Sequence, residues 1–225
     1  MRKSKILNPG YIYVLALGES QYYVGETNNL KRRLQEHVTG LFYDTKKRKW
    51  VIGGSVMTRQ VKPHTLIGLY RPNLSYIRFK ELVHRNTNMM DLDVCVRNVR
   101  TETETELTLQ YMEIYGKSQV KGAHWCSPDK TPKQETIESL KNSSRPLCKC
   151  DIPAEKIINH LGKEKWVCGT YFIHEMFGKE LIPSKRGLLL PITEHLTIKV
   201  SLSCDCDRVV DQPVFLSQKN IAKGI

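Results

Sequence analysis

The chain has 225 residues, of which 40% are hydrophobic and 26% charged, a composition typical of folded globular proteins. Its 35 lysines and arginines outnumber 23 acidic residues and give a formal net charge of +12, which favours a polyanionic partner such as nucleic acid. No apolar run approaches the ~20 residues that cross a bilayer, and the start MRKSKILNPG lacks the apolar region of a secretory signal. We therefore expect a soluble intracellular protein, in the cytoplasm or nucleus, that does not act on membranes.

The N-terminal part of the chain predicts a β-hairpin. YIYVLAL at residues 11–17 and QYYVG at residues 21–25 both have the composition of strands. The segment GES between them supplies a turn, so the two strands are expected to pair with each other.

A helix is predicted directly after this hairpin. Apolar residues recur there with helical spacing at Leu30, Leu34 and Val38. Thr27 or Asn28 can cap the start of this helix. Arg33 and His37 are four residues apart and border the apolar stripe, so both side chains are expected next to the hairpin.

In this order, the predicted elements resemble the GIY-YIG nuclease family. YIY at residues 11–13 stands where the family has GIY, and YVG at residues 23–25 stands where it has YIG. The spacing to Arg33 and His37 in GETNNLKRRLQEH also fits the family. Further on, GSVMTRQVKPHTLIGLY resembles the family's third strand and the segment before it. TLQYMEIYGKSQVKG resembles a later helix and turn of nuclease-like proteins from large DNA viruses, so the resemblance spans residues 10 to 125 and suggests a viral or mobile-element origin.

The resemblance implies an α/β fold with a small mixed or antiparallel three-stranded sheet flanked by helices. Two positions depart from the family pattern. Tyr11 replaces the first glycine, and Gln119 stands roughly where the family has an asparagine. Glutamine keeps the amide but is longer by one methylene, so a role of that amide in positioning a ligand is in doubt.

The metal-binding glutamate that the resemblance implies has three candidates in TETETEL: Glu102, Glu104 and Glu106. On a helix that continues to residue 115, Glu102 and Glu106 lie on a polar side that is typical of a solvated face. Glu104 falls on the same side as Leu107 and the tyrosines that follow, where a carboxylate is costly unless it is paired or binds a cation. Glu104 also aligns with the family's glutamate, so it is the first choice and Glu106 the second.

The resemblance further implies a metal-dependent DNA endonuclease that hydrolyses phosphodiester bonds. Glu104 would bind a divalent ion, Mg²⁺ or Mn²⁺, and Arg33 would contact the scissile phosphate. Tyr13 would orient or deprotonate the attacking water, and Tyr23 and His37 would position the water, the phosphate or Tyr13. Taken singly, each of these residues has an ordinary structural explanation, and only the ordered set points to a nuclease.

A basic segment follows the first helix. It contains six cations and Trp50, with no acidic residue between the first and the last cation: Lys46, Lys47, Arg48, Lys49, Arg59 and Lys62. Such a mixture suits a surface that binds phosphates and stacks one aromatic ring on a base, and the alternative is a solvated loop.

The C-terminal third collects five of the seven cysteines. Cys148, Cys150 and Cys168 with Cys204 or Cys206 could form a structural zinc site, as could the two Cys-x-Cys pairs without Cys168. His160 is a further candidate ligand, and reduced cysteines without metal are the alternative. PLCKCDIPAEKIINHLGKEKWVCG loosely resembles a GRF-type zinc finger.

The composition suggests two domains: a nuclease domain at residues 1–126, a linker rich in Ser, Pro and Lys at residues 127–146, and a cysteine-rich accessory domain at residues 147–225. Two other functions stay open. The chain could bind nucleic acid without cutting it, or it could be a zinc-containing regulatory protein on a nuclease scaffold.

Overall fold

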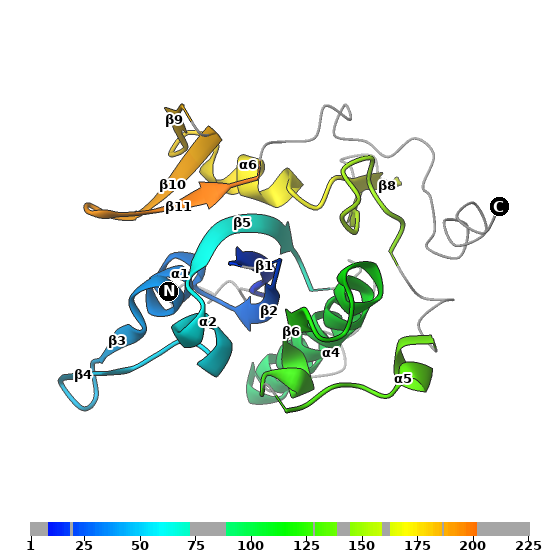
Figure 1. The fold of residues 1–225 in the computed structure, drawn as a ribbon, viewed down its shortest axis with the longest axis horizontal. Helices are drawn as coiled ribbons and strands as arrows, with labels where there is room; N and C mark the ends of the chain where they lie inside the picture. The colour runs from blue at the N-terminus through cyan, green and yellow to red at the C-terminus, as the bar shows by residue number, and fades with distance from the viewer. Residues whose placement is uncertain are drawn as a thin grey trace.

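The computed structural model describes residues 9–18, 20–72, 89–127, 129–138, 145–158, 163–185 and 187–201. It is a mixed α/β structure around one sheet with the strand order β6-β2-β1-β5-β11-β10-β9 (Figure 1). The strands of this sheet are β1 (Tyr11–Leu17), β2 (Tyr22–Thr27), β5 (Pro63–Tyr70), β6 (Val120–Lys121), β9 (Ile182–Ser184), β10 (Gly187–Thr193) and β11 (Leu196–Val200). The expected α/β class and the mixed sheet flanked by helices are therefore confirmed.

The predicted hairpin forms the centre of the sheet. β1 and β2 pair antiparallel with Tyr13 opposite Gly25 and Leu15 opposite Tyr23. On its other side β1 pairs antiparallel with β5, and β6 adds parallel to β2.

Helices cover both faces of this sheet. Tyr13, Leu15 and Leu17 pack on one face with apolar residues of α1 (Leu30–Thr39) and α6 (Tyr171–Phe177). Ile12 and Val14 pack on the opposite face with apolar residues of α4 (Met89–Tyr115). Because both faces are covered, β1 is apolar along its length rather than alternating between apolar and polar residues.

The sheet is larger than the three strands that the resemblance implies. β11 pairs parallel with β5 through Lys199 and Val200, and β10 and β9 continue the sheet beyond it. In Figure 1, β5 lies between the N-terminal hairpin and these C-terminal strands. The strands were missed because the exposed edge of β5 is completed by residues more than 100 positions away, which local patterns do not reveal. The proposed division into domains stays a prediction, although main-chain pairing continues across it.

The helix ends are set by local capping. α1 begins after Asn29, whose side chain accepts a hydrogen bond from the N–H of Arg32, so the expected caps Thr27 and Asn28 are wrong. Thr27 supports the cap instead, because its hydroxyl oxygen accepts from the N–H of Asn29. α1 ends at Gly40, whose φ of 75° is the left-handed conformation that glycine adopts without strain.

Several shorter helices and strands lie outside the main sheet and the helices that cover it. The structure also has β3 (Leu41–Asp44), β4 (Lys49–Ile52), α2 (Val56–Gln60), the 3-10 turn η1 (Ala123–Trp125), α5 (Gln134–Glu138), β7 (Glu155–Ile158) and β8 (Glu164–Val167). β3 and β4 form a separate antiparallel hairpin that projects beyond α1 and α2 at the lower left of Figure 1. Among the described helices, none is long and apolar enough to cross a membrane.

Candidate active site

The candidate active site is centred on the hydroxyl group of Tyr13, which contacts the side chains of His37 and Arg33. This hydroxyl lies 2.6 Å from His37 Nε2 and accepts a hydrogen bond of 3.2 Å from Arg33 Nε. Since the guanidinium can only donate, the phenol is left to donate its own proton to His37 Nε2. Tyr23 completes the group, with its ring centroid 6.3 Å from that of Tyr13 and 5.0 Å from that of His37.

Gly25 provides the space for this arrangement. A Cβ at this position would lie 2.4 Å from the Tyr13 hydroxyl oxygen and 2.8 Å from Tyr23 Cε1. The Tyr13 side chain therefore lies directly over the glycine that faces it across the hairpin. This contact gives the glycine of the YVG motif a packing role, because a methyl group would displace both tyrosines.

Two supporting residues were not found from the sequence. Thr58 lies 2.8 Å from His37 Nδ1 and is itself fixed by a capping box with Ser55 at the start of α2. Glu36 is buried and forms ion pairs with Arg33 at 2.7 Å and with Arg32 at 3.2 Å. Ser-x-x-Thr is a recognisable start of a helix, but only the tertiary structure shows that α2 packs its first turn against His37.

Burial shifts the proton affinities of these groups strongly. Burial raises the pKa values of Tyr13 and Tyr23, and the nearby Arg33 charge does not reverse this, so both phenols are neutral at pH 7. Burial, with a smaller contribution from Arg33, lowers the pKa of His37 to about 3. His37 is consequently neutral, and its Nε2 can accept a hydrogen bond from the Tyr13 hydroxyl group.

Glu104 joins the site from α4. It is buried, as its helical spacing with Leu107 predicts, whereas Glu102 is exposed and Glu106 is intermediate. One of its carboxylate oxygens accepts a hydrogen bond of 3.3 Å from the N–H of Ala123 in η1. Burial, followed by repulsion from Glu26, raises the pKa of Glu104 to about 7, while Arg33 acts in the opposite direction.

The negative charge of Glu104 affects the two tyrosines of the site. Its carboxylate raises the pKa values of Tyr13 and Tyr23, which places it near both phenols. The structure thus brings together the five residues selected from the sequence: Tyr13, Tyr23, Arg33, His37 and Glu104. Gln119, in contrast, contributes its main chain here, where its carbonyl accepts from the N–H of Tyr22 and holds β6 against β2.

The six basic residues of the predicted DNA-binding segment are all exposed, but they are not one contiguous strand or helix. Three lie in the turn between β3 and β4, namely Lys46, Lys47 and Arg48, and Lys49 begins β4. Arg59 is in α2, where its Nη1 donates to the carbonyl of Gly53, and Lys62 follows this helix.

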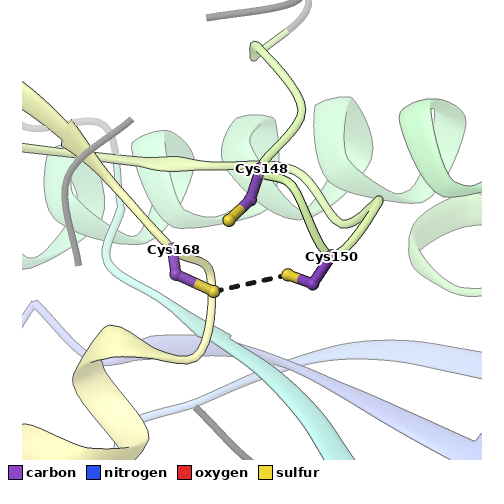
Figure 2. Close-up of side chains that lie close together, drawn as sticks. All are labelled: Cys148, Cys150 and Cys168. Carbon is purple, nitrogen blue, oxygen red and sulfur yellow. Dashed lines mark hydrogen bonds between the residues drawn. The ribbon is translucent and has the colours of Figure 1, made fainter. Parts of the chain in front are cut away.

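Three cysteines of the C-terminal third form a second cluster (Figure 2). The sulfur atoms of Cys148, Cys150 and Cys168 lie within 4.8 Å of one another, and those of Cys150 and Cys168 are 3.5 Å apart. Hydrogen bonds from the Cys148 and Cys150 thiols, and another from Thr170, lower the pKa of Cys168. The remaining candidate ligands Cys204, Cys206 and His160 lie outside the described residues.

Comparison with known proteins gives a match for the segment that carries four residues of the first cluster. No curated protein and no solved structure matches the chain significantly. A family model does match: residues 9–68 correspond to the GIY-YIG catalytic domain, which includes Tyr13, Tyr23, Arg33 and His37. The resemblance read from YIY and YVG is therefore confirmed over residues 9–68, a segment that contains β1, β2, α1 and most of β5 and has a nuclease-type fold.

Proposed function

We propose that the chain is a metal-dependent DNA endonuclease that hydrolyses phosphodiester bonds at the site around Tyr13. One observation carries this proposal. The Tyr13 hydroxyl contacts both Arg33 and His37, and a buried carboxylate with a raised pKa, Glu104, stands close to it. A fixed positive charge, a hydrogen-bonding phenol and a site for a cation are what phosphodiester hydrolysis needs.

Arg33 is the phosphate-binding group in this proposal. Its side chain is 26% exposed, whereas the Glu36 carboxylate that orients it is only 5% exposed. The guanidinium is thus fixed from the protein side and accessible from the solvent side. A fixed and planar guanidinium is well suited to two parallel hydrogen bonds with phosphate oxygens.

Tyr13 acts in this proposal as a neutral hydrogen-bonding group. Its raised pKa argues against a phenolate at neutral pH, so it would orient the attacking water rather than remove a proton from it as an anion. Neutral His37 accepts a hydrogen bond from the phenol and fixes the direction of that hydroxyl group. Thr58 in turn fixes the plane of the imidazole ring.

Glu104 fits the metal ion that the family implies. A buried carboxyl with a pKa of about 7 is destabilised as an anion, and a divalent cation would relieve that cost. Mg²⁺ or Mn²⁺ bound there would stabilise the charge that develops on the phosphate and acidify a bound water. Glu26 lies close by, because it is the second cause of the raised pKa of Glu104, and its carboxylate is ion-paired with Arg100 at 3.0 Å.

The cations of the basic segment would hold the DNA backbone. Their contacts would contribute affinity without base identity, because phosphates are the same at every position. This proposal involves six exposed side chains: Lys46, Lys47, Arg48, Lys49, Arg59 and Lys62.

The test is cleavage of labelled duplex, nicked, flap and branched DNA by the purified chain in Mg²⁺ or in EDTA. Cleavage in Mg²⁺ that EDTA abolishes is the expected result, with the Glu104→Gln variant as the inactive control. Salt-sensitive binding without cleavage of any substrate would instead favour a nucleic-acid-binding protein that has lost its activity.

We also propose that the cysteine cluster binds a structural zinc ion. Tetrahedral zinc with Zn–S bonds of about 2.3 Å places thiolate sulfurs about 3.8 Å apart, close to the spacing observed here. Zinc would bind these sulfurs as thiolates and would replace the proton-mediated hydrogen bonds that now lower the pKa of Cys168 and raise that of Cys150. A fourth ligand from Cys204 or Cys206 would complete the site.

The Cys168→Ser variant is expected to lose zinc and to melt at a temperature lower by several degrees. The loops of the cluster support the nuclease domain, because the carbonyl of Gly169 accepts from the N–H of Leu69 at 3.0 Å and that of Pro153 accepts from the Tyr70 hydroxyl at 3.0 Å. Elemental analysis and thermal unfolding measure the two effects. Cys95→Ser, outside the cluster, serves as the control and keeps the metal. Purified wild-type protein that contains no zinc and does not melt higher when zinc is added would contradict this proposal.

A further inference from the structure

The hairpin of β3 and β4 is connected directly to the elements that carry the candidate active site. It begins at the C-terminal end of α1, which carries Arg33 and His37, and leads into α2, which carries Thr58. Its base is closed by a hydrogen bond of 2.9 Å from the N–H of Gly53 to the carbonyl of Gly40. The base of the hairpin lies next to the site, because a Cβ at Gly53 would meet Glu36 Cβ at 3.3 Å and one at Gly54 would meet His37 Nδ1 at 3.4 Å. A ligand held on this hairpin would therefore extend outward from the end of the site that His37 occupies.

One face of this hairpin is apolar and exposed. Leu41 pairs with Ile52, and Tyr43 pairs with Trp50, so these four side chains lie on the same face. Their exposed fractions are 43%, 72%, 48% and 60% in that order. We call these four residues the ribbon face. Side chains of the opposite face, Phe42 and Val51, are half-buried.

Exposing such an apolar face to water lowers the stability of an isolated hairpin. Two strands of four residues have little stability of their own, and exposed apolar clusters on folded proteins usually mark binding sites. The ribbon face is thus better explained by an external partner than by the stability of the fold.

The charges around the ribbon face indicate an acidic partner. Lys46, Lys47 and Arg48 occupy the turn at its tip, and Lys49 stands next to Trp50. The acidic residue of the hairpin, Asp44, is engaged locally, since its Oδ1 accepts from the N–H groups of Lys46 and Lys47. The exposed lysines and arginine therefore give the tip a positive field.

The aromatic pair indicates which kind of acidic partner the ribbon face binds. Tyr43 and Trp50 contact each other edge to face, with ring centroids 5.6 Å apart and planes at 69°. In such a pair one ring presents only its edge to the other, so its faces remain available to a ligand. Nucleobases stack on exposed aromatic rings when they are unpaired, whereas base faces inside a duplex are covered by their neighbours.

From the exposed rings, the apolar flanks and the basic tip we infer that the ribbon face binds unpaired nucleotides of the DNA substrate. Trp50 stacks on a base, and the cations at the tip bind the phosphates on either side. This inference rests on the proposed function and narrows its substrate class to DNA with a single-stranded part next to the cleavage site, such as a flap or a branch.

The test measures binding of the full chain in EDTA, so that cleavage plays no part. Fluorescence anisotropy compares a single strand, a flap and a blunt duplex of matched sequence. Trp50→Leu keeps an apolar side chain but removes the aromatic ring, and it is expected to weaken binding to the strand and the flap about 10-fold and to the duplex by less than about 3-fold. Trp50→Phe restores most of the affinity, because it keeps a ring that can stack.

A second variant tests whether the cations at the tip of the hairpin bind phosphates. Replacing Lys46, Lys47 and Arg48 by alanine should reduce the slope of log affinity against log salt by about 2 for the single strand. Ile182→Ala, which changes a side chain that is 48% exposed on β9, is the matched surface control and should leave binding unchanged.

The outcomes separate this inference from the proposed function. Binding to unpaired DNA that depends on Trp50, in a chain that cuts nothing, supports the inference and contradicts the nuclease proposal. Metal-dependent cleavage with no effect of Trp50→Leu on any binding overturns the inference alone. Equal losses for duplex and single strand also overturn it, as would self-association of the chain that Trp50→Leu abolishes without changing DNA binding.

Discussion

Replacing Glu104 by glutamine is expected to abolish metal-dependent cleavage and, at the same time, to stabilise the metal-free fold at alkaline pH. The loss of activity should reach about 10³-fold, because the amide keeps the shape of the side chain but loses the negative charge that binds the cation. The gain in stability follows from the burial that raises the pKa of Glu104 to about 7.

The size of this stabilisation depends on pH. In the unfolded chain the carboxyl ionises near its ordinary pKa of 4.5, whereas in the folded chain it ionises near 7, so ionisation opposes folding. The variant should therefore match the wild type below pH 4.5 and gain stability between pH 4.5 and 7. Above pH 7 the difference in free energy of unfolding should level off at about 3 kcal/mol.

Urea denaturation in EDTA at pH 4.5 and pH 8 measures this difference. Addition of Mg²⁺ at pH 8 should stabilise the wild type and leave the variant unchanged, since only the carboxylate binds the ion. The same stability difference at both pH values would show that ionisation of Glu104 is not its cause.

Gly25→Ala is the second substitution with a large expected effect. The new methyl group would lie within 2.6 Å of Tyr13 Cζ, so either the ring of Tyr13 or the strand must move. We expect a loss of about 2–3 kcal/mol in the free energy of unfolding, as for other forced insertions in a packed core. Cleavage should fall about 100-fold, because the Tyr13 hydroxyl would leave its place between Arg33 and His37.

A double-mutant cycle identifies the origin of this effect. In a Tyr13→Ala background, the same glycine substitution should cost clearly less stability, because its main steric conflict has been removed. Gly18→Ala is the matched control, since the nearest atom to its new Cβ is Val61 Cγ1 at 3.3 Å. An equal cost of Gly25→Ala in both backgrounds would exclude the contact with Tyr13 as the cause.

The candidate site shows what short sequence patterns can and cannot reveal. The strand pattern of YIYVLAL and the helical spacing of Leu30 and Leu34 depend on neighbours in the chain, and both elements formed where they were expected. The burial of Glu104 also followed from helical spacing, because its position on the apolar side of α4 is a local property. Thr58 could not be selected in this way, since its importance comes from a contact with His37 across 21 residues.

By itself, the sequence determined the opening hairpin, the helix that follows it and the GIY-YIG motif, because each depends on hydrogen bonds and side-chain periodicity within a few residues. Only the tertiary structure decided that β11 extends the sheet from the edge of β5 and that Cys150 meets Cys168. It alone also decided that the ribbon face stays exposed beside α1. Pairing and burial between distant segments depend on the free energy of the whole packed chain, for which no local pattern exists.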